Sequence, residues 1–153
     1  METLEIKKKD ALKAFSAGDE SAKQLLRNLF GAKVFDAKIT DRVKTFEDAC
    51  EIVGEDPEDD NFITGTDDEI AYKKLKVICR ALNEGTVLSF ANSSQRKWRP
   101  WFQWSGSGFR YDDAFYVAAG TASSGGSRLC FHSEELAIYA GQQFIDLYNQ
   151  LLK

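Results

Sequence analysis

The sequence of 153 residues contains one histidine, two prolines and three cysteines, and it has no apolar run of about 18 residues. With His132 as the single histidine, zinc sites built from several histidines are excluded, and a Ser-His-Asp triad would depend on this one residue. The cysteines, Cys50, Cys79 and Cys130, lie far apart in apolar segments rather than in Cys-x-x-Cys pairs, so we interpret them as reduced core residues. The first residues lack the apolar stretch of a secretory signal, so we expect a cytoplasmic protein without a membrane-spanning segment.

Acidic residues outnumber basic ones, with 24 Asp and Glu against 20 Lys and Arg and a net charge of -4. This charge provides no long-range attraction for phosphate backbones, so nucleic-acid binding is disfavoured and needs a local basic patch. Nine of the acids lie in residues 51–70, which contain no base. The residues that start at Asp56 do not match the calcium-binding loop of an EF-hand, because Asn61 and Asp67 occupy the positions that the loop requires to be Gly and Glu. We therefore expect a solvated loop there, and neither a metal nor a cofactor.

The spacing of apolar residues and of helix caps predicts one α+β domain over residues 1–153. Its first part, residues 1–85, is expected to be mainly helical. Residues 97–131 are expected to form a three-stranded antiparallel sheet, and residues 133–152 an amphipathic helix packed on that sheet. The strands are predicted over residues 97–104, 109–117 and 128–131. The caps that support the helices are Asp19 with Gly31, Thr45 with Gly54, the Thr66-x-x-Glu69 capping box with Gly85, and Ser133.

The first predicted strand carries all three tryptophans of the chain. Alternation places Trp98 and Trp104 on one face of the strand and Trp101 on the other, together with the charged side chains. Pro100 lacks a backbone N–H group, which is typical of an edge strand. The face that the last helix covers therefore decides which tryptophans are buried.

Eight aromatic side chains lie between Trp98 and Tyr116 and are interleaved with cations. Three interpretations stay open: these side chains form the core of the sheet, a protein-binding surface, or a platform on which single-stranded nucleic acid or a nucleotide stacks. Trp101 separates the interpretations, because an exposed Trp101 is a candidate anchor for a partner. The candidate binding residues are Trp98, Trp101, Arg96, Lys97, Arg99, Arg110 and Tyr116.

Two pairs of neighbouring residues bear on catalysis. Alternation sends Asp112 and Asp113 to opposite faces of the sheet, which argues against a carboxylate pair that shares a proton. Cys130 and His132 fall on the same strand face, the minimum geometry for a Cys-His nucleophile, but no oxyanion motif accompanies them. We expect no catalytic residue, whereas a rival hydrolase hypothesis predicts an unusually reactive Cys130 thiol.

Six segments carry a family resemblance: Ile39–Cys50, Ala71–Lys76, Ala81–Gly85, Ser127–Phe131, Ser133–Ala137 and Tyr139–Phe144. They are similar to segments of a group of small uncharacterised proteins from gut Bacteroidales and their phages and prophages. Thr86 and Phe90 depart from the group, which often has Trp at both positions. The group has no catalytic motif to carry over. The resemblance implies an accessory, virion-associated or host-interaction role, in the host cytoplasm or in the virion.

We therefore expect a noncatalytic interaction or accessory module of phage or mobile-element type that binds another protein. The sheet edge and the aromatic patch are the surfaces expected to contact this partner. The alternative is single-stranded nucleic-acid or nucleotide binding through an aromatic and basic sheet face, with an affinity that falls as salt is added.

Overall fold

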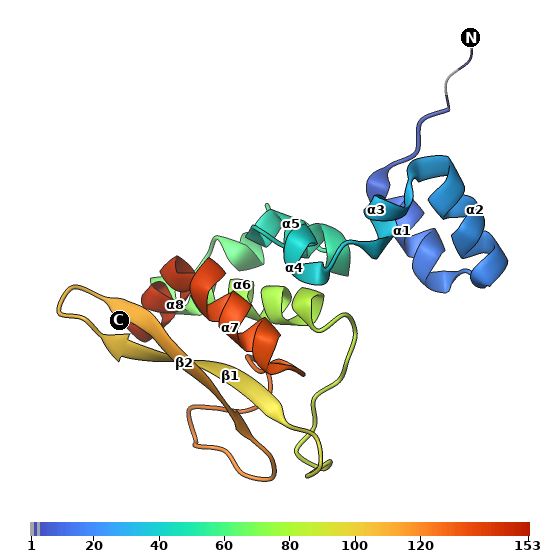
Figure 1. The fold of residues 1–153 in the computed structure, drawn as a ribbon. Helices are drawn as coiled ribbons and strands as arrows, with labels where there is room; N and C mark the ends of the chain where they lie inside the picture. The colour runs from blue at the N-terminus through green and yellow to red at the C-terminus, as the bar shows by residue number, and fades with distance from the viewer. Residues whose placement is uncertain (1, 3) are drawn as a thin grey trace. The chain divides into compact units, whose positions relative to one another are not determined.

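The computed structural model describes residue 2 and residues 4–153, and the chain divides between Arg42 and Val43 into two compact units. The fold class is α+β, as the sequence predicted, with helices in both units and a two-stranded antiparallel sheet in the second (Figure 1). The first unit contains α1 (Lys8–Ala17), α2 (Glu20–Phe30), α3 (Ala32–Asp36) and α4 (Ile39–Arg42). The second contains α5 (Phe46–Val53), the 3-10 helix η1 (Asp60–Phe62), α6 (Asp67–Leu82), β1 (Lys97–Trp104), β2 (Phe109–Val117), α7 (Glu134–Gln143) and α8 (Ile145–Leu152).

Helix boundaries in both units lie close to the predicted caps. The carboxylate of Asp19 accepts a hydrogen bond from the backbone N–H of Ala22 at 2.8 Å and begins α2, and Thr45 and Asp48 form a capping box at the start of α5. Gly54 ends α5 in the left-handed region with φ 77°, a conformation that glycine adopts without steric cost. These predictions are confirmed because capping is a local property of a few neighbouring residues.

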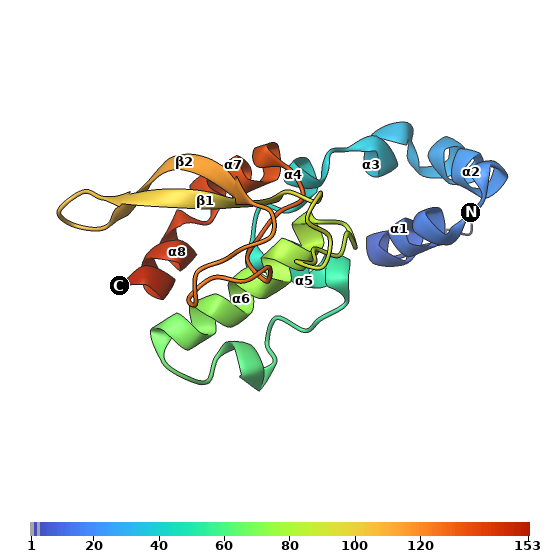
Figure 2. The same ribbon diagram turned by 90° about the horizontal axis from the view of Figure 1, so that it is seen from below.

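In the second unit, α7 and α8 lie along one side of the β1–β2 hairpin (Figure 1). Helix α8 also packs against α6, and α6 against α5, so the hairpin, α8 and α6 follow one another in the view of Figure 2. Leu75, Ile78 and Leu82 recur at helical spacing on α6 and are fully buried. They form the centre of the core beneath α8.

The prediction of a third strand was wrong. Instead of a strand over residues 128–131, Phe131 forms an isolated bridge in which its backbone exchanges hydrogen bonds of 2.7 and 2.8 Å with Trp98. Pro100, two residues further along β1, faces the same edge and has no N–H to donate to a continued strand. The sheet is therefore two-stranded. The pairing on the outer edge of β1 is limited to Trp98 and does not continue at Pro100.

The C-terminal helix packs on the sheet as predicted, but it is interrupted. Phe144 has φ -110° and ψ 29°, which separates α7 from α8. The change of direction lets α7 pack on both strands while α8 reaches β2 and α6 together. Phe144 is buried at this bend.

Candidate functional site

The hairpin has one face toward the last two helices and one face away from them. On the first face, the ring centroid of Phe102 lies 4.6 Å from that of Tyr148 in α8, and Pro100 and Tyr111 pack against Gly141 of α7. Strand pairing and alternation define the second face, which points away from these helices and which we call the open face. The open face consists of Arg99, Trp101, Gln103, Arg110, Asp112, Asp113 and Phe115.

A β-bulge brings two acids onto the open face. The register pairs Trp101 with Asp113 and Phe102 with Tyr111. Asp112 is therefore an extra residue on β2, and because alternation restarts at an inserted residue, Asp112 and Asp113 lie on the same face. The prediction that they point to opposite faces was wrong, since a period of two does not reveal an insertion. Both acids are exposed beside Trp101.

Trp101 is stacked within a small cluster on the open face. Its ring centroid lies 5.4 Å from that of Phe115 in an edge-to-face arrangement, and the guanidinium carbon of Arg99 lies 4.7 Å from the Phe115 centroid. Trp101 is 52% exposed, so it meets the condition that the sequence set for a candidate anchor. The Nε atom of Arg99 is buried without a hydrogen-bond partner, and no described residue forms an ion pair with Arg99. The cluster thus presents an exposed indole ring beside a cation that is in no ion pair with the residues the structure describes.

Lys97 lies inside the fold and not on the surface. Its side chain is 0% exposed, and its Nζ donates hydrogen bonds to the backbone oxygens of Gln95 at 2.7 Å, Ala118 at 2.9 Å and Asn92 at 3.0 Å. The same Nζ lies 5.1 Å from the centroid of the Phe90 ring. A binding role for Lys97 does not fit this placement, because all three donors of the ammonium are used within the protein.

Three other predicted binding residues gather on the helix-facing side, at the end of the hairpin far from its turn. The guanidinium carbon of Arg96 lies 4.5 Å from the Tyr116 centroid, and the rings of Tyr116 and Trp98 lie 5.0 Å apart. Arg110 is exposed on the open face, where it pairs with Gln103 near the turn. The structure therefore brings Arg99, Trp101 and Arg110 to one face and the other cluster to the opposite face, because neighbouring strand residues alternate.

Side chains occupy part of the outer edge of β2. The Asn149 amide in α8 accepts from the backbone N–H of Phe109 at 2.7 Å and donates to its carbonyl at 2.8 Å, as a neighbouring strand would do. The Oδ1 of Asp113 accepts from the N–H of Ala114 at 2.8 Å. Sequence reasoning missed these contacts, since Asn149 has no local signal of a partner 40 residues away. The open face, rather than this edge, is the candidate contact surface.

Comparison of the chain with known protein families, curated proteins and solved structures found no match. Within the described residues, no group of three or more His, Cys, Asp or Glu side chains is arranged to hold a metal ion. None of the described helices is long and apolar enough to cross a membrane. The geometry of the hairpin is therefore the basis on which a function is proposed.

The backbones of Cys130 and His132 are held by the side chain of Asn83, which is buried at the end of α6. Its Nδ2 donates to the Cys130 carbonyl and its Oδ1 accepts from the His132 N–H, both at 2.9 Å. The Cys130 thiol is buried and donates to the Gly126 carbonyl at 3.2 Å, whereas His132 is exposed. Burial raises the pKa of the Cys130 thiol. Arg99 and Lys97 act to lower this pKa, but burial outweighs them, so the thiol has neither the exposure nor the depressed pKa of a nucleophilic cysteine.

We expect none of the three thiols in the folded protein to react with iodoacetamide at neutral pH. Burial raises the pKa of Cys79 well above its usual range, and burial together with the nearby Glu55 raises the pKa of Cys50 to about 11. Intact-mass measurement is expected to show unmodified protein in buffer and three adducts in denaturant. Selective labelling of Cys130 in the folded protein would contradict this and favour the hydrolase hypothesis.

The same thiols set a direction for the pH dependence of stability. A thiol whose pKa is higher in the folded chain holds its proton longer there, so deprotonation favours the unfolded chain. For Cys50 the stabilisation is complete at lower pH and is lost as pH rises from 9.0 to about 11. Urea unfolding followed across this range is expected to show a falling midpoint, and replacing Cys50 by alanine is expected to reduce the slope.

Proposed function

We propose that the protein is a noncatalytic interaction module that binds another protein through the open face of the hairpin. The observation that carries the proposal is the exposed Trp101 ring, which meets Phe115 edge to face beside the Arg99 guanidinium, for which no described residue supplies an ion pair. Exposed aromatic rings and arginines are the residues that most often dominate binding energy at protein interfaces. The resemblance of the sequence to phage-associated proteins supports an accessory role of phage or mobile-element type.

The charges of the open face favour a protein partner over a polynucleotide. Arg99 and Arg110 are the cations of this face, and Asp112 and Asp113 lie at Trp101 on the partner strand. A strand of nucleic acid carries one charge sign along its length, so the acids oppose the phosphates that would follow a base stacked on Trp101. A protein surface can offer a carboxylate to Arg99 and a cation to the acids.

Replacing Trp101 by alanine is expected to weaken partner binding at least about 30-fold, the loss typical of a central interface residue. Trp104→Ala is the matched control, because Trp104 is 51% exposed on the opposite face of the same strand. Immobilised wild type and both variants are incubated with lysate of the source cells, and bound proteins are quantified by mass spectrometry. The partner is identified as the protein lost with the Trp101 variant and retained with the Trp104 variant. Identical capture by all three proteins would contradict the proposal.

Tryptophan fluorescence distinguishes the nucleic-acid alternative from the protein-binding proposal. All three tryptophans lie in β1, so their emission reports on this strand alone. We expect a mixed-sequence single-stranded oligonucleotide at low salt to leave the emission unchanged. Quenching that is reversed by salt and abolished by Trp101→Ala would replace the protein-binding proposal with single-stranded nucleic-acid or nucleotide binding.

A further inference from the structure

Helix α2 in the first unit exposes a stripe of leucines. Leu25 is 58% exposed and Leu29, one turn later, is 65% exposed. Ser21 lies one turn before Leu25 on the same side of α2 and is also exposed. An amphipathic helix normally turns such a stripe toward a packing partner, which this unit alone does not provide.

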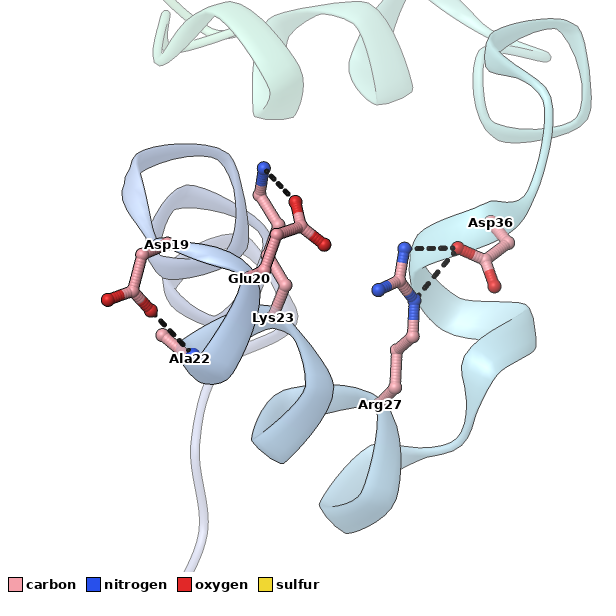
Figure 3. Close-up of polar contacts among 6 residues, drawn as sticks. All are labelled: Asp19, Glu20, Ala22, Lys23, Arg27 and Asp36. Carbon is pink, nitrogen blue, oxygen red and sulfur yellow. Dashed lines mark hydrogen bonds and ion pairs between the residues drawn. The ribbon is translucent and has the colours of Figure 1, made fainter.

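The charged side of α2 is the side that packs within the unit. The Lys23 ammonium lies 6.0 Å and the Arg27 guanidinium carbon 4.8 Å from the centroid of the Phe15 ring in α1. Lys23 pairs with Glu20 at 3.4 Å, and Arg27 pairs with Asp36 in α3 at 3.2 Å. Figure 3 shows both contacts. Every charged side chain of α2 is therefore already paired inside its own unit.

The residues flanking the leucines are uncharged. Gln24 and Asn28 lie on one side of the stripe, and the Gln24 Nε2 donates to the Asn28 Oδ1 at 3.0 Å. Amide side chains both donate and accept, so they are complementary to a second copy of themselves. The stripe has no charge to select a charged partner and none to repel an identical surface.

The first unit also buries little of its own apolar surface. Among its described residues, Ala11, Phe35 and Ile39 are the buried ones, and an apolar hollow of about 560 Å³ remains beside Ile6 and Phe30. All three cysteines lie in the second unit, so no disulfide supports the first. Units of about 40 residues usually need a disulfide, a metal or association with a further chain.

We propose that α2 is a self-association surface and that its occupant is α2 of a second copy of this chain. A twofold axis through the stripe would set the leucines of one copy against those of the other and the amides of Gln24 and Asn28 across from one another. This inference does not rest on the function proposed for the hairpin, because the stripe contains no residue of the second unit.

Oppositely charged variants of the full chain test the proposal. Sedimentation equilibrium of wild type is expected to show a monomer–dimer equilibrium. In Leu25→Lys/Leu29→Lys and in Leu25→Glu/Leu29→Glu, like charges meet across the axis, and the association constant is expected to fall at least about a hundredfold. Ile63→Glu/Val87→Glu is the matched control, because these two aliphatic residues are as exposed but lie in the second unit. The control is expected to associate like wild type.

Mixing identifies the occupant of the stripe. An equimolar mixture of the Lys and Glu variants is expected to restore dimers that contain one chain of each kind. Monomeric wild type, or variants that stay monomeric when mixed, would overturn the proposal, since a stripe covered by another surface is not repaired by its own copy. A label on Lys13→Cys, at an exposed position of α1, gives a second measurement that leaves both leucines and both amides in place. The dipolar coupling between the labels on the two copies of a dimer is expected to vanish when the labelled protein is diluted with unlabelled protein.

Discussion

Replacing Lys97 by methionine is expected to lower the free energy of unfolding of residues 43–153 by about 3 kcal/mol. Methionine fills nearly the same volume but donates no hydrogen bond, so three backbone oxygens around the site lose their donor together. Each of these bonds comes from a charged group, which makes it stronger than a bond between neutral groups. Urea unfolding followed by tryptophan emission measures the effect, because all three tryptophans lie in this unit.

Lys73→Met is the matched control for this experiment. The Lys73 ammonium reaches a single backbone oxygen, that of Thr64 at 3.1 Å, in an exposed position. We expect its replacement to change the free energy of unfolding by less than about 1 kcal/mol. If Lys97→Met is as stable as this control, water replaces the lost donors and the buried ammonium contributes no net stability.

Gly141→Ala is expected to lower the free energy of unfolding of the same unit by about 2 kcal/mol, although alanine is the better helix former. A β-carbon at this position would lie 2.6 Å from Cδ2 of Tyr111 and 2.7 Å from Cβ of Pro100. Both distances are shorter than carbon atoms tolerate, so α7 has to move away from the hairpin. Gly141→Val is expected to destabilise the unit further.

Gly120→Ala is the control for the effect of removing a glycine. A β-carbon at Gly120 would meet no atom within 4 Å, so we expect a change below about 0.5 kcal/mol. Differential scanning calorimetry of both variants compares the two positions directly. A Gly141→Ala variant as stable as wild type would show that α7 can shift on the sheet without a loss of stability.

The helix ends could be predicted from the sequence, whereas the features that position the hairpin could not. The cap at Thr45 uses residues within one turn, so its side-chain chemistry is visible locally. Lysine is usually a surface residue, so the sequence gives no sign that Lys97 is buried. The oxygens that accept its hydrogen bonds belong to the loop before β1 and to the residue after β2. Gly141 gives no sequence signal either, because the atoms that exclude a β-carbon come from distant strands.

The candidate site was predicted in part. Alternation alone placed Trp101 on the face opposite Trp98 and Trp104, and the structure confirms that placement. The stacking of Arg99 on Phe115 depends on the register between the strands, which the pattern of one strand does not contain. The bulge at Asp112 shifts this register by one residue, so it also changes which acids accompany Trp101.

The treatment of the strand edges has a consequence for solubility during folding and storage. A hairpin that exposes two tryptophans would ordinarily be an aggregation hazard, because exposed strands template further strands. Here Pro100 provides no backbone N–H on the outer edge of β1. On the outer edge of β2, the side chains of Asn149 and Asp113 form hydrogen bonds with backbone groups that a further strand would need. Cross-β growth needs continuous backbone pairing, and neither edge offers it. The hairpin therefore exposes aromatic side chains on strands whose two edges are interrupted for the addition of a further strand.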